Sequence, residues 1–246
     1  QLRNQGMVLG EDSEKMSKSR GNVVAPDNLV QSYGADATRA FLMFFARWDM
    51  GGPWSSGGID GVMRWLRRVW SNLLEPVPAG PAAAADVKAL RRKLHQTLRS
   101  VTRDFEQFEF NTIISSLMEL SNEMARLKDK VYGHPVWVEA VEIYAQMLAP
   151  VTPHIAEEIW QYIGKPYSIH TSQWPVVDEA AAAVEEITLV IQVNGKVRDR
   201  INLPADINEE DARSQALSSE AVQKLLEGKE PRQVVYVKGR LVNIVI

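Results

Sequence analysis

The chain has 246 residues, of which 45% are hydrophobic and 24% charged, so it can bury at least one core as one or two soluble domains. Its net charge of -3 argues against bulk electrostatic binding to nucleic acid, so any such binding must come from local clusters. The absence of cysteine excludes disulfides and thiolate metal sites and favours a cytoplasmic protein. No apolar run approaches the roughly 20 residues that span a bilayer, so we expect no membrane segment.

The first 58 residues combine a polar loop with short helices. The loop carries the stretch KMSKSRGNVV, residues 15–24. A short helix is predicted over residues 26–33. A second, over 37–47 and capped by Asp36, is apolar nearly all round, so we expect it to be buried on most sides. The run GGPWSSGG at residues 51–58 is rich in turn formers and predicts a boundary.

Residues 59–165 are predicted to form an antiparallel helix bundle. Hydrophobic residues recur at spacings of three and four from Val62 to Leu74, which is typical of an amphipathic helix. Further helices are predicted over residues 86–105, 111–131, 136–148 and 153–164. The pattern places Trp65, Trp70 and Trp160 in the core rather than at a base-stacking surface.

The rest of the chain is predicted as a linker over residues 166–186 and a small domain over residues 187–246. In the small domain the hydrophobic period changes to two, and the NG pair at Asn194 supplies the positive φ angles of a tight hairpin turn. Two short helices and two further strands follow. The fold class is therefore mainly α, with a C-terminal α+β domain of the pattern ββααββ.

The loop at residues 15–24 carries the chemistry that decides the function. Lys15 and Lys18 are flexible point charges that could meet phosphate oxygens, and Ser17 and Ser19 could add hydrogen bonds. Two lysines at one triphosphate could neutralise the charge that builds on departing pyrophosphate. A Lys/Ser segment of this kind is more often an ordinary solvated loop, and the loop's composition leaves both readings open.

The segments around the loop resemble a known family. KMSKSRGNVV with PDNLVQSYGADATRAFLM, WSSGGIDGVMRWLRRVW and MLAPVTPHIAEEIWQYIG is similar to class I aminoacyl-tRNA synthetases of the group for leucine, isoleucine, valine and methionine. IQVNGKVRDRINLP and VVYVKGRLVNIVI resemble the C-terminal domain of bacterial-type leucyl-tRNA synthetases. A cysteine-bearing zinc module or a terminal coiled coil would favour isoleucine or valine, so leucine is the best assignment.

The resemblance implies that ATP with Mg²⁺, leucine and tRNA-Leu are the substrates of the full enzyme. Lys18 would be the lysine most closely tied to ATP, with Lys15 assisting, and Ser17 and Ser19 would complete the ATP-binding set. No H-I-G-H type sequence and no editing domain is present, so we expect a C-terminal fragment that is inactive alone and monomeric. The alternatives are a noncatalytic RNA-binding module, or the related isoleucyl, valyl or methionyl enzyme.

The same resemblance makes the bundle an anticodon-binding domain and the C-terminal domain a tRNA-binding one. On the bundle, the candidate phosphate contacts are Arg64, Arg67 and Arg68, and further along Arg91, Arg92, Lys93 and Arg99. In the C-terminal domain they are Lys196, Arg198, Arg200, Lys238 and Arg240. Asp12 and Glu14 are expected to pair with the loop lysines when no nucleotide is bound. No cluster of His, Asp and Glu has metal-ligand spacing, so we expect no metal site.

Overall fold

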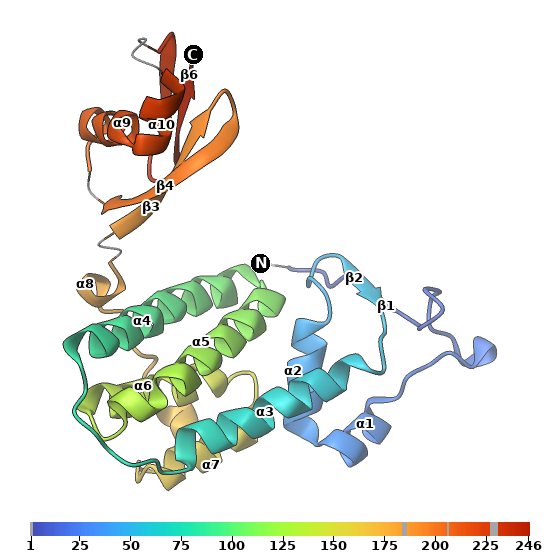
Figure 1. Cartoon of the computed structure of the whole chain (residues 1–246). Coiled ribbons are helices and arrows are strands. Elements are labelled where there is room, and N and C mark those ends of the chain that lie inside the picture. Colours follow the sequence, from blue (N-terminus) through green and yellow to red (C-terminus); the bar gives the residue numbers. More distant parts are fainter. Residues whose placement is uncertain (1, 184–185, 206, 227–230) are drawn as a thin grey trace. The chain divides into compact units, whose positions relative to one another are not determined.

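The computed structural model describes residues 2–183, 186–205, 207–226 and 231–246, and of Glu186 only the backbone. It contains two compact units, Gln1–Ala182 and Ala183–Ile246 (Figure 1). The first unit is largely helical and the second combines helices with a sheet, which confirms the predicted fold class. Within the described ranges, no helix has the length and apolarity needed to cross a membrane.

The first unit begins with an irregular region that carries the lysine loop. It contains β1 (Met7–Leu9), a short 3-10 helix (Lys18–Arg20), α1 (Pro26–Tyr33), α2 (Ala35–Phe44) and β2 (Gly51–Pro53). β1 and β2 pair in parallel, so the strand before the loop is tied to the segment that precedes the bundle. Trp54, directly after β2, is buried and packs edge-on against Phe41 of α2, with ring centroids 5.0 Å apart.

The helix bundle follows, and its helices match the predicted ranges within a few residues. They are α3 (Gly58–Leu74), α4 (Ala84–Gln107), α5 (Phe110–Val131), α6 (Pro135–Leu148) and α7 (Pro153–Tyr162). Each presents a hydrophobic face to one shared core, as their 3.6-residue periodicity requires.

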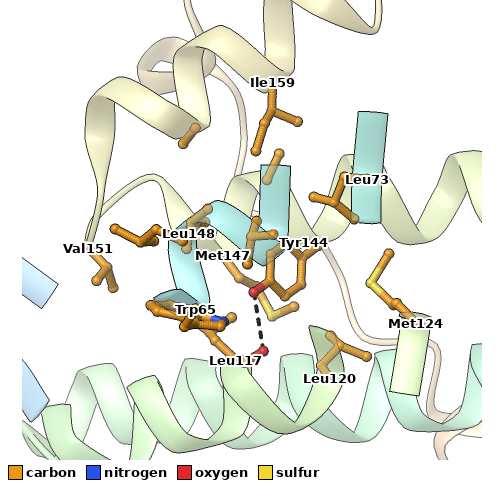
Figure 2. Close-up of a cluster of buried hydrophobic side chains, with 14 of the residues drawn as sticks. Trp65, Leu73, Leu117, Leu120, Met124, Tyr144, Met147, Leu148, Val151 and Ile159 are labelled. Atoms are coloured by element: carbon orange, nitrogen blue, oxygen red, sulfur yellow. Dashed lines mark hydrogen bonds between the residues drawn. The ribbon is translucent and has the colours of Figure 1, made fainter. Parts of the chain in front are cut away.

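Two large polar aromatic side chains lie in the middle of this core (Figure 2). The fully buried Tyr144 donates a hydrogen bond from its hydroxyl to the carbonyl of Leu117, over 3.2 Å. Burial raises the pKa of this hydroxyl. Trp65 donates from Nε1 to Oγ of Ser121, also over 3.2 Å. Both rings therefore fill the core without leaving a polar atom unsatisfied.

Trp65 and Trp160 are buried as predicted, but the prediction for Trp70 is wrong. Trp70 is 39% exposed and meets the exposed Tyr162 edge-on. The buried stripe of α3 runs through Val62, Leu66, Val69 and Leu73, and Trp70 lies at its edge. A helix-wide pattern of apolar residues is broader than the face that the neighbouring helices cover.

The expectation that α2 is buried on most sides is also wrong. Its buried face consists of Ala37, Thr38, Ala40 and Phe41, whereas Leu42 is 42% and Phe44 37% exposed. The described bundle therefore packs against one face of α2. Leu42 instead lines an apolar hollow of about 550 Å³ with Val8, Met43 and Phe45, among other residues.

The prediction that Asp36 caps its own helix is wrong. The N-cap of α2 is Gly34, and no side-chain cap forms there. The carboxylate of Asp36 instead accepts the backbone N–H groups of His154, over 3.3 Å, and Ile155, over 2.7 Å. It also contacts Nδ1 of His154 at 2.8 Å. Asp36 thus caps the start of α7, 118 residues further along the chain.

Arg39, one turn after Asp36, binds the other side of the same corner. Its guanidinium donates to the carbonyls of Val151, over 3.1 Å, and Pro150, over 2.9 Å. These carbonyls follow the C-terminus of α6, where the helix dipole favours a cation. The α6–α7 corner is therefore held by one acid and one base from α2.

Most of the segment predicted as a linker lies within the first unit. It includes a short 3-10 helix (Ile169–Thr171) and α8 (Glu179–Ala182). Trp174 Nε1 donates to Oγ1 of Thr102 over 2.9 Å, and the side chain of Gln96 donates to the carbonyl of Ala182 over 3.0 Å. The pattern of Pro and Ala residues gave no sign of these contacts with α4. Residues 184–185 lie outside the described ranges, and the predicted domain limits stay a prediction.

The second unit has the predicted order of two strands, two helices and two strands. Its elements are β3 (Glu186–Val193), β4 (Lys196–Pro204), α9 (Glu209–Ser218), α10 (Glu220–Leu226), β5 (Gln233–Val237) and β6 (Leu241–Val245). The strand order is β4-β3-β6-β5, with β3 and β6 parallel. Asn194 and Gly195, at φ of 49° and 76°, form the β3–β4 turn. Leu189, Ile191, Val242 and Ile244 form the core with the two helices.

Replacing Asp36 by Ala should destabilise the first unit by about 1–2 kcal/mol, because the N–H groups at the start of α7 lose their acceptor. All seven tryptophans lie between Trp48 and Trp174, so urea unfolding followed by tryptophan fluorescence reports on this unit. The matched control is Asp49→Ala, which removes only an exposed ion pair with Arg47 and should change the unfolding free energy by less than about 0.5 kcal/mol. Equal effects of the two substitutions would contradict the capping role.

Candidate functional site

The lysine loop is a folded hairpin-like excursion from β1. Leu9 and Lys15 form an antiparallel bridge, and the N–H of Gly10 donates to the carbonyl of Glu14 over 2.8 Å. The 3-10 helix at residues 18–20 then ends at Gly21, whose φ of 68° allows the chain to turn back. The loop thus has a defined backbone: Lys15 lies at the bridge to Leu9, and Ser17, Lys18 and Ser19 lie at the start of the 3-10 helix.

Within this loop, Lys15 and Lys18 are exposed, and Ser17 and Ser19 contact each other through their hydroxyls at 2.7 Å. Among the described residues, no carboxylate forms an ion pair with either lysine. Both ammonium groups are therefore available to an anionic ligand.

The expected pairing of Asp12 and Glu14 with the lysines does not occur. Asp12 accepts from the side-chain amide of Asn22, at 3.1 and 3.2 Å, and from the backbone N–H of Glu14, at 3.0 Å. The carboxylate of Glu14 pairs with Arg20 over 3.0 Å. Proximity in sequence suggested lysine partners, but the fold of the loop directs both acids to other residues.

Glu11 anchors the loop to the segment before the bundle. Its carboxylate accepts the backbone N–H of Ser56 over 3.0 Å. Hydrogen bonds from the side chain and then the backbone of Ser56 lower the pKa of Glu11. Trp54 adds a backbone bond to the carbonyl of Leu9 over 2.9 Å. The loop is therefore connected at its base to the same segment that packs on α2.

The two predicted basic clusters of the bundle differ in their partners. Arg64, Arg67 and Arg68 are exposed on α3, and none of the ion pairs among the described residues involves them. On α4, by contrast, Arg91 binds Glu139 and Asp178, Lys93 binds Glu119, and Arg99 binds Glu179. Arg92 has no such partner within the described ranges. The α3 cluster thus keeps its charge available, whereas three of the α4 cations are used within the fold.

In the second unit, the predicted cations Lys196, Arg198, Arg200, Lys238 and Arg240 are exposed and form no ion pair within the part of the chain that is described. Arg200 pairs with Val190, which pairs in turn with Leu241 beside Arg240. Arg200 and Arg240 are therefore about two strand spacings, or about 10 Å, apart. Together with Lys238 they form one basic group.

Lys196 lies at the other end of this sheet. It adjoins the Asn194–Gly195 turn, four residues and about 13 Å along β4 from Arg200. A register shift between Ile191 and Gln192 leaves Arg198 without a cross-strand partner, and the exposed Arg198 and Arg200 alternate along β4 with the less exposed Asp199. Asp199 lies between the two arginines but accepts from Ser219 Oγ at the junction of the two helices, a hydrogen bond that lowers its pKa.

Asn22 is the loop residue that sequence reasoning missed. Its side chain contacts Asp12, Lys15 and Ser17. The signal available in the sequence was an amide directly after Gly21, at the point where the loop returns. In the described ranges, no group of three or more His, Asp or Glu side chains could hold a metal ion.

Family models match two parts of the chain. The model described as "tRNA synthetases class I (I, L, M and V)" matches residues 1–49, which include the lysine loop. The model "Anticodon-binding domain of tRNA ligase" matches residues 87–213, just over half of the chain. The fold and the loop are thus those of class I tRNA ligases.

Curated relatives narrow this class. The chain is 54% identical over 245 residues to a leucine-tRNA ligase of Deinococcus radiodurans, and 50% identical over 246 residues to one of Dehalococcoides mccartyi. These matches cover 99% and 100% of this chain but 30% of each relative. The chain therefore belongs to the tRNA ligases that carry this anticodon-binding domain, and it is similar along its whole length to leucine-tRNA ligases, of which it spans about a third.

Solved structures agree with this assignment. The ternary complex of Agrobacterium radiobacter agnB2 LeuRS with tRNA and LeuAMS matches all of this chain and 33% of that chain, with a TM-score of 0.83 and 30% identity. A methionyl-tRNA synthetase of Mycobacterium tuberculosis covers 72% of this chain with a TM-score of 0.51 and 24% identity, which shows a shared fold alone. The resemblance noted in the sequence is confirmed.

Proposed function

We propose that the chain is the C-terminal part of a cytoplasmic, monomeric leucine-tRNA ligase. In the full reaction, the carboxylate of leucine attacks the α-phosphate of ATP to give leucyl-adenylate and pyrophosphate, and the leucyl group then passes to a terminal ribose hydroxyl of tRNA-Leu. Mg²⁺ enters with ATP as part of the substrate. This chain supplies the lysine loop and the tRNA-binding surfaces.

The observation that carries the catalytic part is the pair of unpartnered lysines on a folded loop. Lys18, assisted by Lys15, binds the phosphates and neutralises the charge that develops on the leaving pyrophosphate. One such contact is worth about 3 kcal/mol in the transition state. Ser17 and Ser19 add hydrogen bonds to the same group.

The tRNA-binding part rests on the unpaired cations. The exposed guanidinium groups of Arg64, Arg67 and Arg68 follow one side of α3 and suit a run of phosphates on an RNA stem. The basic groups of the second unit, Lys196 at one turn and Arg200 with Arg240 near the other, offer a second contact. A protein with a net charge of -3 can bind RNA in this way because its cations are locally concentrated.

The direct test is a chimera in which this chain replaces the matching part of the Deinococcus radiodurans leucine-tRNA ligase. We expect leucine-dependent exchange of pyrophosphate into ATP and leucylation of tRNA-Leu. Lys18→Ala should reduce the exchange rate about 100-fold, as expected for loss of a transition-state contact. A chimera that folds but exchanges no pyrophosphate would contradict the catalytic role.

The RNA partner is tested by equilibrium binding of the 246-residue chain to a panel of tRNAs at one salt concentration. We expect tRNA-Leu to bind more tightly than tRNA-Ile, tRNA-Val and tRNA-Met. Preference for one of the other three would indicate the related enzyme for that amino acid. Equal binding of all four would favour a noncatalytic RNA-binding module.

Replacing Arg64, Arg67 and Arg68 together by Ala should weaken tRNA-Leu binding and lower the slope of log affinity against log salt by up to about 0.9 per lost phosphate contact. The control is the triple replacement Lys93→Ala, Arg99→Ala and Arg126→Ala, which changes the net charge equally but removes cations already paired with carboxylates. The control should alter the slope much less. Equal changes would mean that general charge, and not the α3 surface, binds the RNA.

Replacing Lys196, Arg198 and Arg240 together by Ala should also weaken binding and reduce its salt dependence, because these cations lie on the exposed turns and edge of the second unit. The measurement is the same salt series with tRNA-Leu. Arg213, which pairs with Glu209 on α9, provides a control position in the same unit. An unchanged slope in the triple variant would argue against RNA binding by this unit.

A further inference from the structure

One side chain, that of Asn22, joins the parts of the loop that carry the two lysines. Its Oδ1 accepts the N–H of Ser17 over 2.8 Å, between Lys15 and Lys18. Its Nδ2 lies 3.4 Å from the carbonyl of Lys15. The side-chain amide of Asn22 therefore contacts the backbone at Lys15 and just before Lys18, although it contacts neither ammonium group.

Asn22 also contacts Asp12, which gives this carboxylate a partner other than the two lysines. Nδ2 lies 3.1 and 3.2 Å from the two carboxylate oxygens of Asp12, and the same carboxylate also accepts the N–H of Glu14. Glu14 in turn pairs with Arg20. With both acids engaged, neither lysine has to give up an ion pair before it meets a phosphate.

The space around this contact depends on Gly10. A Cβ atom at position 10 would lie 2.6 Å from Oδ1 of Asp12 and 2.9 Å from Nδ2 of Asn22, so both side-chain ends would have to shift. Glycine at this position leaves room for the carboxylate and the amide to meet beside β1. The side chains of Asp12 and Asn22 therefore pack closely together beside Gly10, directly after β1.

We propose that Asn22 is a positioning residue for the reaction. Through Asp12, Lys15 and Ser17 it holds the loop in the form that presents Lys15 and Lys18 together and without carboxylate partners. This inference rests on the proposed function and names a residue outside the set of groups that contact ATP.

The test uses Asn22→Asp in the chimera. The new carboxylate faces the carboxylate of Asp12, so repulsion replaces the hydrogen bond and turns the side chain at position 22 away from the N–H of Ser17. We expect kcat of leucine-dependent pyrophosphate exchange to fall about 100-fold, as for a misplaced catalytic group, with KM for leucine unchanged.

The second arm adds Asp12→Asn to Asn22→Asp, which reverses the polarity of the contact. The new amide at position 12 can accept the N–H of Glu14 and donate to the new carboxylate at position 22. We expect the double variant to recover most of the lost kcat, short of the parent because the contact with the Lys15 carbonyl is gone. Recovery of this kind separates a specific contact from general damage.

Two controls complete the design. Asn28→Asp makes the same chemical change at an exposed position of α1 and should leave kcat unchanged. In the 246-residue chain, tryptophan fluorescence checks the fold of each variant, and amide hydrogen exchange at Ser17 reports the contact directly. We expect faster exchange at Ser17 in Asn22→Asp and restored protection in the double variant.

The outcomes separate the two hypotheses. If the parent chimera exchanges pyrophosphate and Asn22→Asp matches it, or the double variant regains nothing, the positioning role is wrong while the proposed function stands. If the parent chimera folds but shows no leucine-dependent exchange, the proposed function fails. Unchanged protection of Ser17 in Asn22→Asp would also refute the positioning role, independently of activity.

Discussion

The first unit depends on the way α2 holds the corner between α6 and α7. Asp36 accepts the N–H groups that begin α7, and Arg39 donates to the carbonyls that follow α6. Each charge faces the helix end whose dipole it complements, so one turn of α2 satisfies two ends at once. The same helix carries Phe41, which packs on Trp54 beside β2. The corner, the core and the base of the lysine loop are thus joined through a single ten-residue helix.

This connection explains how a loop can be both exposed and oriented. Its base is held by β1 against β2 and by Glu11 on Ser56, while its tip is organised by its own polar side chains. Exposed lysines lose conformational freedom when they bind a ligand, and a backbone that is already folded reduces that loss. The bundle therefore contributes to the proposed phosphate chemistry through the placement of the loop.

The distribution of ion pairs gives the basic residues two roles. On α4, Arg91 binds Glu139 and Asp178, beside the buried His95, and helps to hold the segment that leads to α8. On α3, the arginines face solvent with no acid partner among the described residues. Both clusters look alike in the sequence, because a basic run on a helix does not reveal which acids the fold brings to it. Among the described residues, all three arginines of the α3 cluster keep the free charge that suits an RNA backbone, but only Arg92 does so in the α4 cluster.

Periodicity and motifs in the sequence alone determined the helices of the bundle, the ββααββ order, the tight turn at Asn194 and the identity of the lysine loop. The first three features follow from local backbone preferences and from the spacing of apolar residues, whereas the lysine loop was identified by its resemblance to class I aminoacyl-tRNA synthetases. The tertiary structure decided what depends on distant partners: the cap that Asp36 provides for α7, the exposure of Trp70 and Leu42, and the separation of Lys196 from Arg240. It also decided the partners of the acids before KMSKSRGNVV: Asp12 binds Asn22 and Glu14 binds Arg20, so neither pairs with Lys15 or Lys18, because hydrogen bonding in a folded loop follows distance in space rather than along the chain.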